Sequence, residues 1–130
     1  MTASLPAIAY DAKTIDRADR TFRCSPFYLK LLLDMRYSGV SITKISGSSG
    51  VELGYTKRKM SELIAENDMV WLIQVGMLRR EVDGQGLTDS FRLTPLGWQI
   101  ANKWDGKQVP KPRKRDRLQN FISRWLRSVL

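Results

Sequence analysis

Three consecutive cations, Lys57, Arg58 and Lys59, form the segment of this sequence whose possible chemistry is easiest to define. Lysine and arginine bind phosphate oxygens, and arginine can also donate two hydrogen bonds to one guanine, which is worth ~1–3 kcal/mol of discrimination between bases. If a helix begins just before them, they oppose its dipole, and a bound anion would offset that cost. The pattern predicts an anion-binding segment, with a solvated basic surface as the alternative. Three neighbouring hydroxyl groups could donate to the same phosphates: Tyr55, Thr56 and Ser61.

Further cations fall in two other regions and at one isolated position. Arg79, Arg80 and Arg92 lie in two short segments that are predicted to be β-strands. There they either contact a phosphate backbone or form cross-strand ion pairs with Glu81 or Asp83. Lys44 is a single candidate for a phosphate contact. A basic run near the C-terminus can follow phosphates along a backbone, and it consists of Lys111, Arg113, Lys114, Arg115 and Arg117.

The distribution of charge indicates an anionic partner. The chain has 130 residues and a net charge of +9. Residues 1–20 have three cationic and three acidic side chains, residues 21–104 have eleven and eight, and residues 105–130 have eight and two. Such a bias suits nucleic acid, an acidic protein surface or an anionic membrane. The alternative is that basic tails only improve solubility.

Composition excludes most catalytic and metal chemistry. The chain has no histidine and one cysteine, Cys24, so a Ser-His or Cys-His pair cannot form and a zinc site is not expected. Asp34, Glu62 and Glu66 are spread over separate helical segments and predict no paired acid-base site. We therefore expect no enzyme activity, no cofactor and no metal. The absence of a disulfide framework, a signal peptide and a long apolar run predicts a cytoplasmic protein.

Periodicity, glycine and proline predict the first elements of the fold. Residues 1–20 have weak periodicity and mixed charge, and they are expected to form an arm that can include a short helix. Ser25-Pro26 predicts a helix start, and the apolar run after it ends at Gly39. Residues 40–46 suit a short second helix, and residues 47–50 are a turn by composition.

The elements after the turn include a hairpin and two further helices. Residues 56–75 are predicted to be helical and end before Gly76. Two short strands follow, joined by a glycine-bearing loop at residues 83–90 rather than by a tight turn. Thr94-Pro95 predicts the next helix start. Residues 105–112 read as a linker, and residues 113–130 as a basic amphipathic helix.

The segment from Gly76 to Arg80, followed by Arg92-Leu93-Thr94-Pro95-Leu96-Gly97, resembles the wing region of bacterial regulators of the MarR and PadR kind. The resemblance covers residues 25–104. It implies a winged helix-turn-helix domain over residues 21–104, with α+β architecture, mainly helical, a two-stranded wing and an additional C-terminal amphipathic helix. It also implies that the wing tip approaches DNA, although the tip of this chain has no Lys or Arg between Asp83 and Ser90.

Two assignments of the recognition helix remain open at the level of sequence. If residues 40–46 and 56–66 form the helix-turn-helix pair, Thr56, Lys57, Arg58 and Lys59 head the recognition helix. If Asn67-Asp68 breaks the helix, residues 69–75 become the second helix, which is too apolar to read DNA. The first assignment is preferred for that reason.

The C-terminal helix has an apolar stripe that predicts a dimer or partner interface. Its members follow three-four spacing and are Leu118, Phe121, Ile122, Trp125, Leu126 and Val129. Pairing of two such helices would give a two-fold dimer with recognition helices about one DNA turn apart. A membrane surface is a less expected use of the same stripe.

Together these patterns predict a homodimeric regulator of transcription that binds double-stranded DNA. A winged-helix module that docks on a larger nucleic-acid-processing complex, and a membrane-surface adaptor, are the alternatives.

Overall fold

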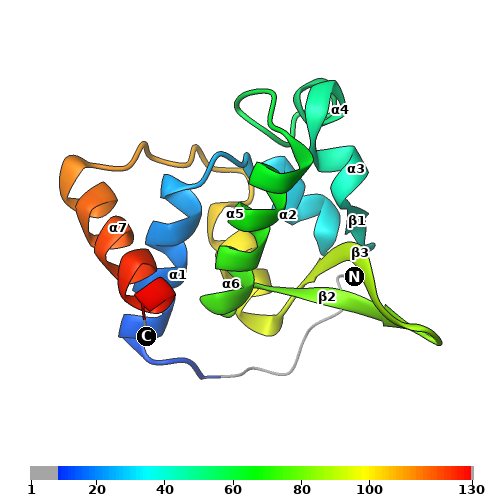
Figure 1. The fold of residues 1–130 in the computed structure, drawn as a ribbon. Helices are drawn as coiled ribbons and strands as arrows, with labels where there is room; N and C mark the ends of the chain where they lie inside the picture. Colours follow the sequence, from blue (N-terminus) through cyan, green and yellow to red (C-terminus); the bar gives the residue numbers. More distant parts are fainter. Residues whose placement is uncertain (1–8, 130) are drawn as a thin grey trace.

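The computed structural model describes residues 9–129, which form an α+β fold with seven helices and one small antiparallel sheet in that range (Figure 1). The mainly helical α+β class predicted from the sequence is confirmed. Residues 1–8 of the expected N-terminal arm lie outside the described residues. No helix in the described part of the chain has the length and apolar character needed to cross a bilayer.

The first helix, α1 (Ala12–Cys24), crosses the boundary that was expected between an arm and a domain at residue 20. Asp11 caps it, because its Oδ1 accepts from the Thr14 backbone N at 2.8 Å. Ala18 and Phe22 are buried in the core. Residues 12–20 are therefore part of the folded body and not a separate arm.

The segment after α1 folds into four short elements: α2 (Leu29–Met35), β1 (Val40–Ser41), α3 (Ile42–Ile45) and α4 (Gly47–Glu52). The turn predicted at residues 47–50 is wrong, because these residues begin α4. Gly50 lies so close to the Ile45 carbonyl that an added Cβ would stand 1.9 Å from that oxygen. Gly50, which reads as part of a turn, is therefore needed for two short helices to meet closely.

The long helix predicted to begin at Thr56 starts instead at Glu62, as α5 (Glu62–Gln74). Ser61 is its N-cap and accepts from the Ile64 backbone N at 3.2 Å. Thr56 cannot cap a helix, because it is buried and pairs with Phe27 in an isolated antiparallel bridge. No break occurs at Asn67-Asp68, since α5 is continuous through both residues. Lys57, Arg58 and Lys59 therefore lie in a loop.

The sheet has the order β1-β3-β2 and consists of β1 and the hairpin β2 (Leu78–Asp83) and β3 (Gly86–Leu93). Asp83 pairs with Gly86, so the hairpin closes with a two-residue turn and not with the expected eight-residue loop. Gly86 has φ of 116°, which other residues rarely adopt. Because the turn is only two residues long, β3 begins at Gly86 and is longer than the predicted second strand.

The predicted start of the next helix, α6 (Pro95–Trp104), is confirmed. Thr94 caps it by accepting from the Gly97 backbone N at 3.2 Å, and its hydroxyl also donates to the Gly76 carbonyl. Residues 107–112 then cross one side of the body in an irregular path to α7 (Lys114–Val129), which lies against α1 (Figure 1). The cap therefore ties the glycine that ends α5 to the start of α6.

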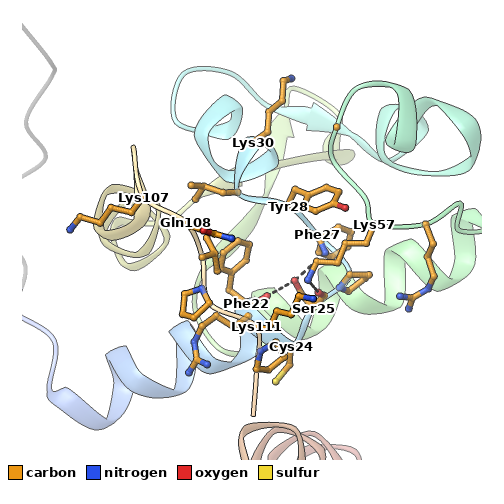
Figure 2. A pocket seen from close by; sticks show the side chains of 18 of the residues that line it. Phe22, Cys24, Ser25, Phe27, Tyr28, Lys30, Lys57, Lys107, Gln108 and Lys111 are labelled. Atoms are coloured by element: carbon orange, nitrogen blue, oxygen red, sulfur yellow. Dashed lines mark hydrogen bonds between the residues drawn. The ribbon is translucent and has the colours of Figure 1, made fainter. Parts of the chain in front are cut away.

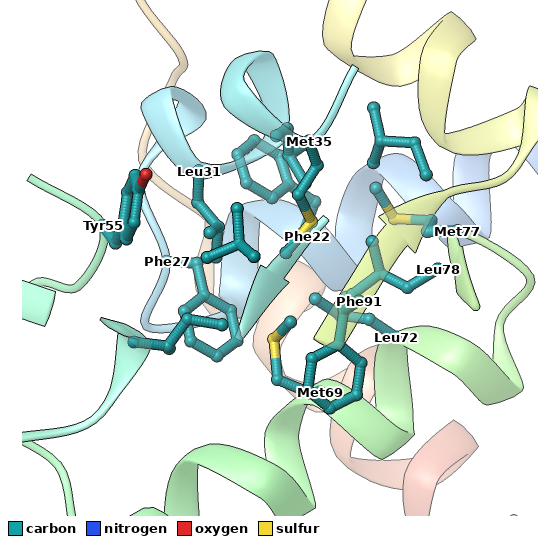
Figure 3. Close-up of a cluster of buried hydrophobic side chains, with 14 of the residues drawn as sticks. Phe22, Phe27, Leu31, Met35, Tyr55, Met69, Leu72, Met77, Leu78 and Phe91 are labelled. Atoms are coloured by element: carbon teal, nitrogen blue, oxygen red, sulfur yellow. The ribbon is translucent and has the colours of Figure 1, made fainter. Parts of the chain in front are cut away.

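One core holds α1, α2, α5, α6 and the sheet together. Its largest fully buried side chains include Phe22, Phe27, Met69, Met77 and Phe91, which meet between the helices and the sheet (Figure 3). Trp71 is buried, and Trp98 and Trp104 pack against the core at its edge. The loop at residues 53–61 and the linker at residues 107–112 both lie on one side of the body (Figure 1).

Candidate functional site

A groove of about 870 Å³ lies where three segments far apart in the sequence meet (Figure 2). The segments are residues 22–30, from the end of α1 to the start of α2, the loop at residues 54–58, and the linker at residues 107–112. Arg117, from the first turns of α7, completes the lining. The groove therefore brings together two basic regions that are far apart in the sequence.

The lining of this groove is strongly basic. In the part of the chain that the structure describes, no aspartate or glutamate lines it, whereas seven cationic side chains do: Arg23, Lys30, Lys57, Arg58, Lys107, Lys111 and Arg117. Two of the seven are neutralised by ion pairs. Arg23 contacts Asp19 and Asp116, and Lys30 contacts Asp34, at 2.9–3.0 Å. Within residues 9–129 the other five form no ion pair, so the groove is positive.

Backbone contacts hold the cationic loop against the segment that follows α1. The Lys57 backbone N donates to the Pro26 carbonyl at 2.8 Å, and its Nζ donates to the Ser25 carbonyl at 3.1 Å. The Tyr28 backbone N donates to the Tyr55 carbonyl at 2.9 Å. These bonds hold two of the three segments that line the groove, the loop and the segment after α1, at a fixed separation. Lys57 lies where the two segments meet.

Aromatic side chains line the groove beside the cations. Phe22 and Phe27 are buried at its base, and Tyr28 is half-exposed at its rim (Figure 2). The Lys57 Nζ lies 6.0 Å from the centre of the Tyr28 ring. A basic groove with an accessible aromatic face suits a ligand that has both phosphates and flat rings.

Burial and neighbouring cations disfavour charge at Lys57. Desolvation lowers the pKa of Lys57, and the nearby Arg117 and Arg58 lower it further. A bound anion would reverse this effect by stabilising the ammonium form. Cys24 also lines the groove, and burial raises the pKa of its thiol, which therefore stays protonated at neutral pH.

Several predicted contact residues lie elsewhere or are buried. Tyr55 and Thr56 are only 6% and 2% exposed, so their predicted contact with phosphate is wrong. The Tyr55 hydroxyl donates instead to Asp34 at 2.7 Å. Ser61 has the structural role of capping α5. Five cations are exposed but do not line the groove: Lys44, Lys59, Arg113, Lys114 and Arg115.

Two of the three hairpin arginines form ion pairs. Arg80 contacts Glu66 at 2.7 Å and lies over the Phe91 ring at 4.9 Å from its centre. Arg92 contacts Glu81 at 3.6 Å, as the cross-strand alternative predicted. Arg79 is exposed and has no ion pair among the described residues. Among the described hairpin arginines, Arg79 is therefore the one whose side chain can contact a phosphate without breaking an ion pair.

The helix that precedes the hairpin is acidic and partly apolar on its surface. α5 contains three acidic residues, Glu62, Glu66 and Asp68, and no lysine or arginine. Leu63 and Ile64 are 69% and 52% exposed near its start. Such a surface is poorly suited to a phosphate backbone.

Sequence reasoning missed Lys107, Lys30 and Tyr28 as groove residues. Lys107 was assigned to the linker, although the spacing of lysines at 107 and 111 beside two prolines signals an extended basic segment. No sequence pattern distinguishes Lys30 and Tyr28 as binding residues, because they lie at the start of a helix that is predicted to pack in the core. Only the fold brings these positions together.

A comparison with protein-family models gave a match to the family described as Npun_F0494-like, over residues 8–124. The match spans α1 to the middle of α7, so it includes all three walls of the groove. The comparisons with curated proteins and with solved structures gave no match.

Proposed function

The chain belongs to the Npun_F0494-like family, and we propose that it is a winged-helix DNA-binding regulator that holds the DNA backbone in the basic groove. The order of elements supports the winged-helix part of the proposal. Helices α1 to α4 and the short strand β1 precede α5, and β2 and β3 follow it as a hairpin. β1 pairs with β3, so the hairpin and the first strand form one sheet, as in that fold.

The observation that carries the proposal is the gathering of five cations along the groove, where, among residues 9–129, none of the five forms an ion pair and no carboxylate lines the groove. They come from the loop, the linker and α7, and they are Lys57, Arg58, Lys107, Lys111 and Arg117. Like charges at close range destabilise a fold unless an anion is present, and burial makes this cost larger at Lys57. A chain of phosphates would neutralise several of these groups at once.

This arrangement favours contacts with the backbone over contacts with base edges. Each phosphate that the protein neutralises makes the slope of log affinity against log salt more negative by about 0.9, so full use of the five cations gives a slope of about −4.5. α5 has no cation with which to approach DNA. We therefore expect weak discrimination between sequences and strong dependence on salt.

A second candidate function is supported by the exposed apolar side chains on α5. Leu63 and Ile64, beside Glu62, would suit an apolar and basic protein surface, as in a winged-helix module that docks on a larger complex. The variant Leu63→Ser/Ile64→Ser distinguishes the two. It should leave DNA binding unchanged, and it should abolish stoichiometric co-purification of a partner if docking through α5 is the function.

The test of the main proposal is fluorescence anisotropy of a labelled DNA duplex and of the matching single strand over a salt series. We expect binding that weakens steeply with salt, and we expect Lys57→Ala/Arg58→Ala/Lys59→Ala to reduce the slope by about 2. Lys59 lies outside the groove and is expected to contribute little. Binding that is absent at low salt, or that does not respond to salt, would overturn the proposal.

A further inference from the structure

Helix α7 is docked on the body through its polar face. Asp116 contacts Arg23 of α1 at 2.9 Å, and the Asn120 Oδ1 accepts from the Trp71 Nε1 at 3.3 Å. Arg124 contacts Asp68 of α5 at 2.8 Å. Arg127 donates to the Gln74 carbonyl at 3.1 Å. These four residues recur every three or four positions, so they mark one face of the helix.

The apolar face of α7 points away from the body. Its six side chains are 43–66% exposed, and they are Leu118, Phe121, Ile122, Trp125, Leu126 and Val129. We call this set the outer stripe. At 100° per residue it is centred almost opposite the docked face. An amphipathic helix on a soluble body normally has the reverse orientation, because burial of the apolar face is what stabilises its docking.

We infer that the outer stripe is covered by the outer stripe of a second copy of this chain, with the two α7 helices antiparallel. This arrangement is isologous, so the same residues of both copies meet around a two-fold axis. The inference is independent of the proposed function, because it rests on α7 and not on the groove.

The area of the outer stripe fits a dimer interface. If each fully exposed side chain of this kind offers ~150–200 Å², the observed exposures leave roughly 500–650 Å² of apolar surface on α7. The largest apolar patch of a typical monomer is ~300–600 Å², and a standard interface buries ~800 Å² per partner. The stripe thus supplies the apolar centre of such an interface, and its polar edges supply the rim.

The charges around the stripe favour a second copy over a lipid surface. Interfacial helices place lysine and arginine along the whole length of the helix beside the apolar face. In α7 the cations of the C-terminal half, Arg124 and Arg127, are held against α5. The remaining cations of the helix, Lys114, Arg115 and Arg117, lie in its first turn.

The positions of the charged side chains on α7 also favour one direction of pairing over the other. No charged side chain lies within the stripe between Leu118 and Val129, so pairing buries no unpaired charge. A parallel pair would bring the two N-terminal ends together, with Lys114 and Arg115 of both copies adjacent. An antiparallel pair separates them by about the helix length, ~24 Å for 16 residues.

Sedimentation equilibrium of the full chain tests the interface. The native chain should be dimeric at micromolar concentration, and Phe121→Glu/Ile122→Glu should raise the dissociation constant at least about 30-fold, as expected for central interface residues. Leu87→Glu, at an exposed apolar position on the hairpin, is the matched control and should leave the constant unchanged. Circular dichroism checks that each variant is folded.

Cysteine cross-linking tests the direction. Cys24 is the single cysteine of the chain, so Cys24→Ser provides a cysteine-free background. In that background, Leu118→Cys and Val129→Cys proteins should cross-link with each other when mixed, and neither should cross-link with itself. Self-cross-linking of each protein alone would overturn the antiparallel arrangement.

Three results would overturn the interface itself. The first is a native chain that stays monomeric to high concentration, whether or not it binds vesicles that contain phosphatidylserine. The second is a dimer that the double variant does not weaken. The third is a dimer that Leu87→Glu weakens to the same extent.

Discussion

Arg23 and Asp116 are separated by 93 residues, and their side chains form an ion pair in which the Nη1–Oδ2 distance is 2.9 Å. Arg23 also contacts Asp19 on its own helix at 3.0 Å. The Asp116 Oδ2 additionally accepts from the Arg113 backbone N at 2.9 Å, so the same carboxylate caps the first turn of α7. One carboxylate therefore joins α1 to α7 and fixes the helix that supplies Arg117 to the groove.

The first prediction concerns the pH dependence of this link. The hydrogen bond from Arg23 is the main reason that the pKa of Asp116 lies below its ordinary value of 3.8. A lowered folded-state pKa means that the stabilisation is complete above pH 3.8 and is lost as the pH falls through the lowered value. Asp116→Asn should increase hydrogen exchange in α7 at neutral pH, and the difference from the native chain should vanish in strong acid. Asp89→Asn, on the hairpin surface, is the control.

The second prediction concerns Tyr55 and Asp34. Burial and the hydrogen bond to Asp34 raise the pKa of Tyr55 to about 12. The phenol is therefore more easily ionised in the unfolded chain, and its contribution to stability is complete below pH 10 and is lost between pH 10 and about 12. Tyr55→Phe should remove the last phase of a spectrophotometric titration and lower the free energy of unfolding at pH 7 by ~0.5–1.5 kcal/mol. Tyr37→Phe, at an exposed position, should change neither quantity.

The third prediction concerns the close approach at Gly50. An added Cβ would lie 1.9 Å from the Ile45 carbonyl oxygen and 2.8 Å from the Thr56 Oγ1. The Gly50 carbonyl also accepts from the Tyr55 and Thr56 backbone N atoms, so the loop that contains Lys57 depends on this position. Gly50→Ala should lower the free energy of unfolding by ~1–3 kcal/mol in a denaturant titration. Gly84→Ala has no atom within 4 Å of the new Cβ and serves as the reference; equal stability of the two variants would contradict the packing described.

The fourth prediction concerns the hairpin arginine Arg80. Its ion pair with Glu66 and its contact with the Phe91 ring give it a structural role. Arg80→Ala should reduce the free energy of unfolding by ~0.5–1 kcal/mol, because the pair is partly exposed. It should not change the salt slope of DNA binding. A reduced slope with unchanged stability would instead assign Arg80 to the DNA contact.

The sequence predicts correctly those helix ends that are determined by residues next to them in the chain. Thr94-Pro95 marks the start of α6 because the threonine caps the helix and the proline needs no donor there. Gly76 ends the turn after α5 with φ of 89°, a conformation that favours glycine. Both signals lie within a few residues of the structure that they determine.

The start of α5 and the groove could not be predicted in the same way. Thr56 is as good a cap by type as Ser61, but the fold uses it in a bridge to Phe27. The groove joins residues 22–30, 54–58 and 107–117, and no local pattern relates these segments. The sequence predicts a basic run near the C-terminus, but the position of this run beside Lys57 follows from the docking of α7.

The most direct test of the groove as the DNA-binding surface compares two variants with the same change in net charge. Lys107→Glu/Lys111→Glu alters the groove, and Lys44→Glu/Arg79→Glu alters exposed cations outside it. Fluorescence anisotropy with one duplex over a salt series gives the affinity and slope of each. The groove variant should lose at least about tenfold in affinity and about 2 in slope, and the outside variant should stay near the native chain. Equal losses in both variants, or a loss only in the outside variant, would contradict DNA binding through the groove.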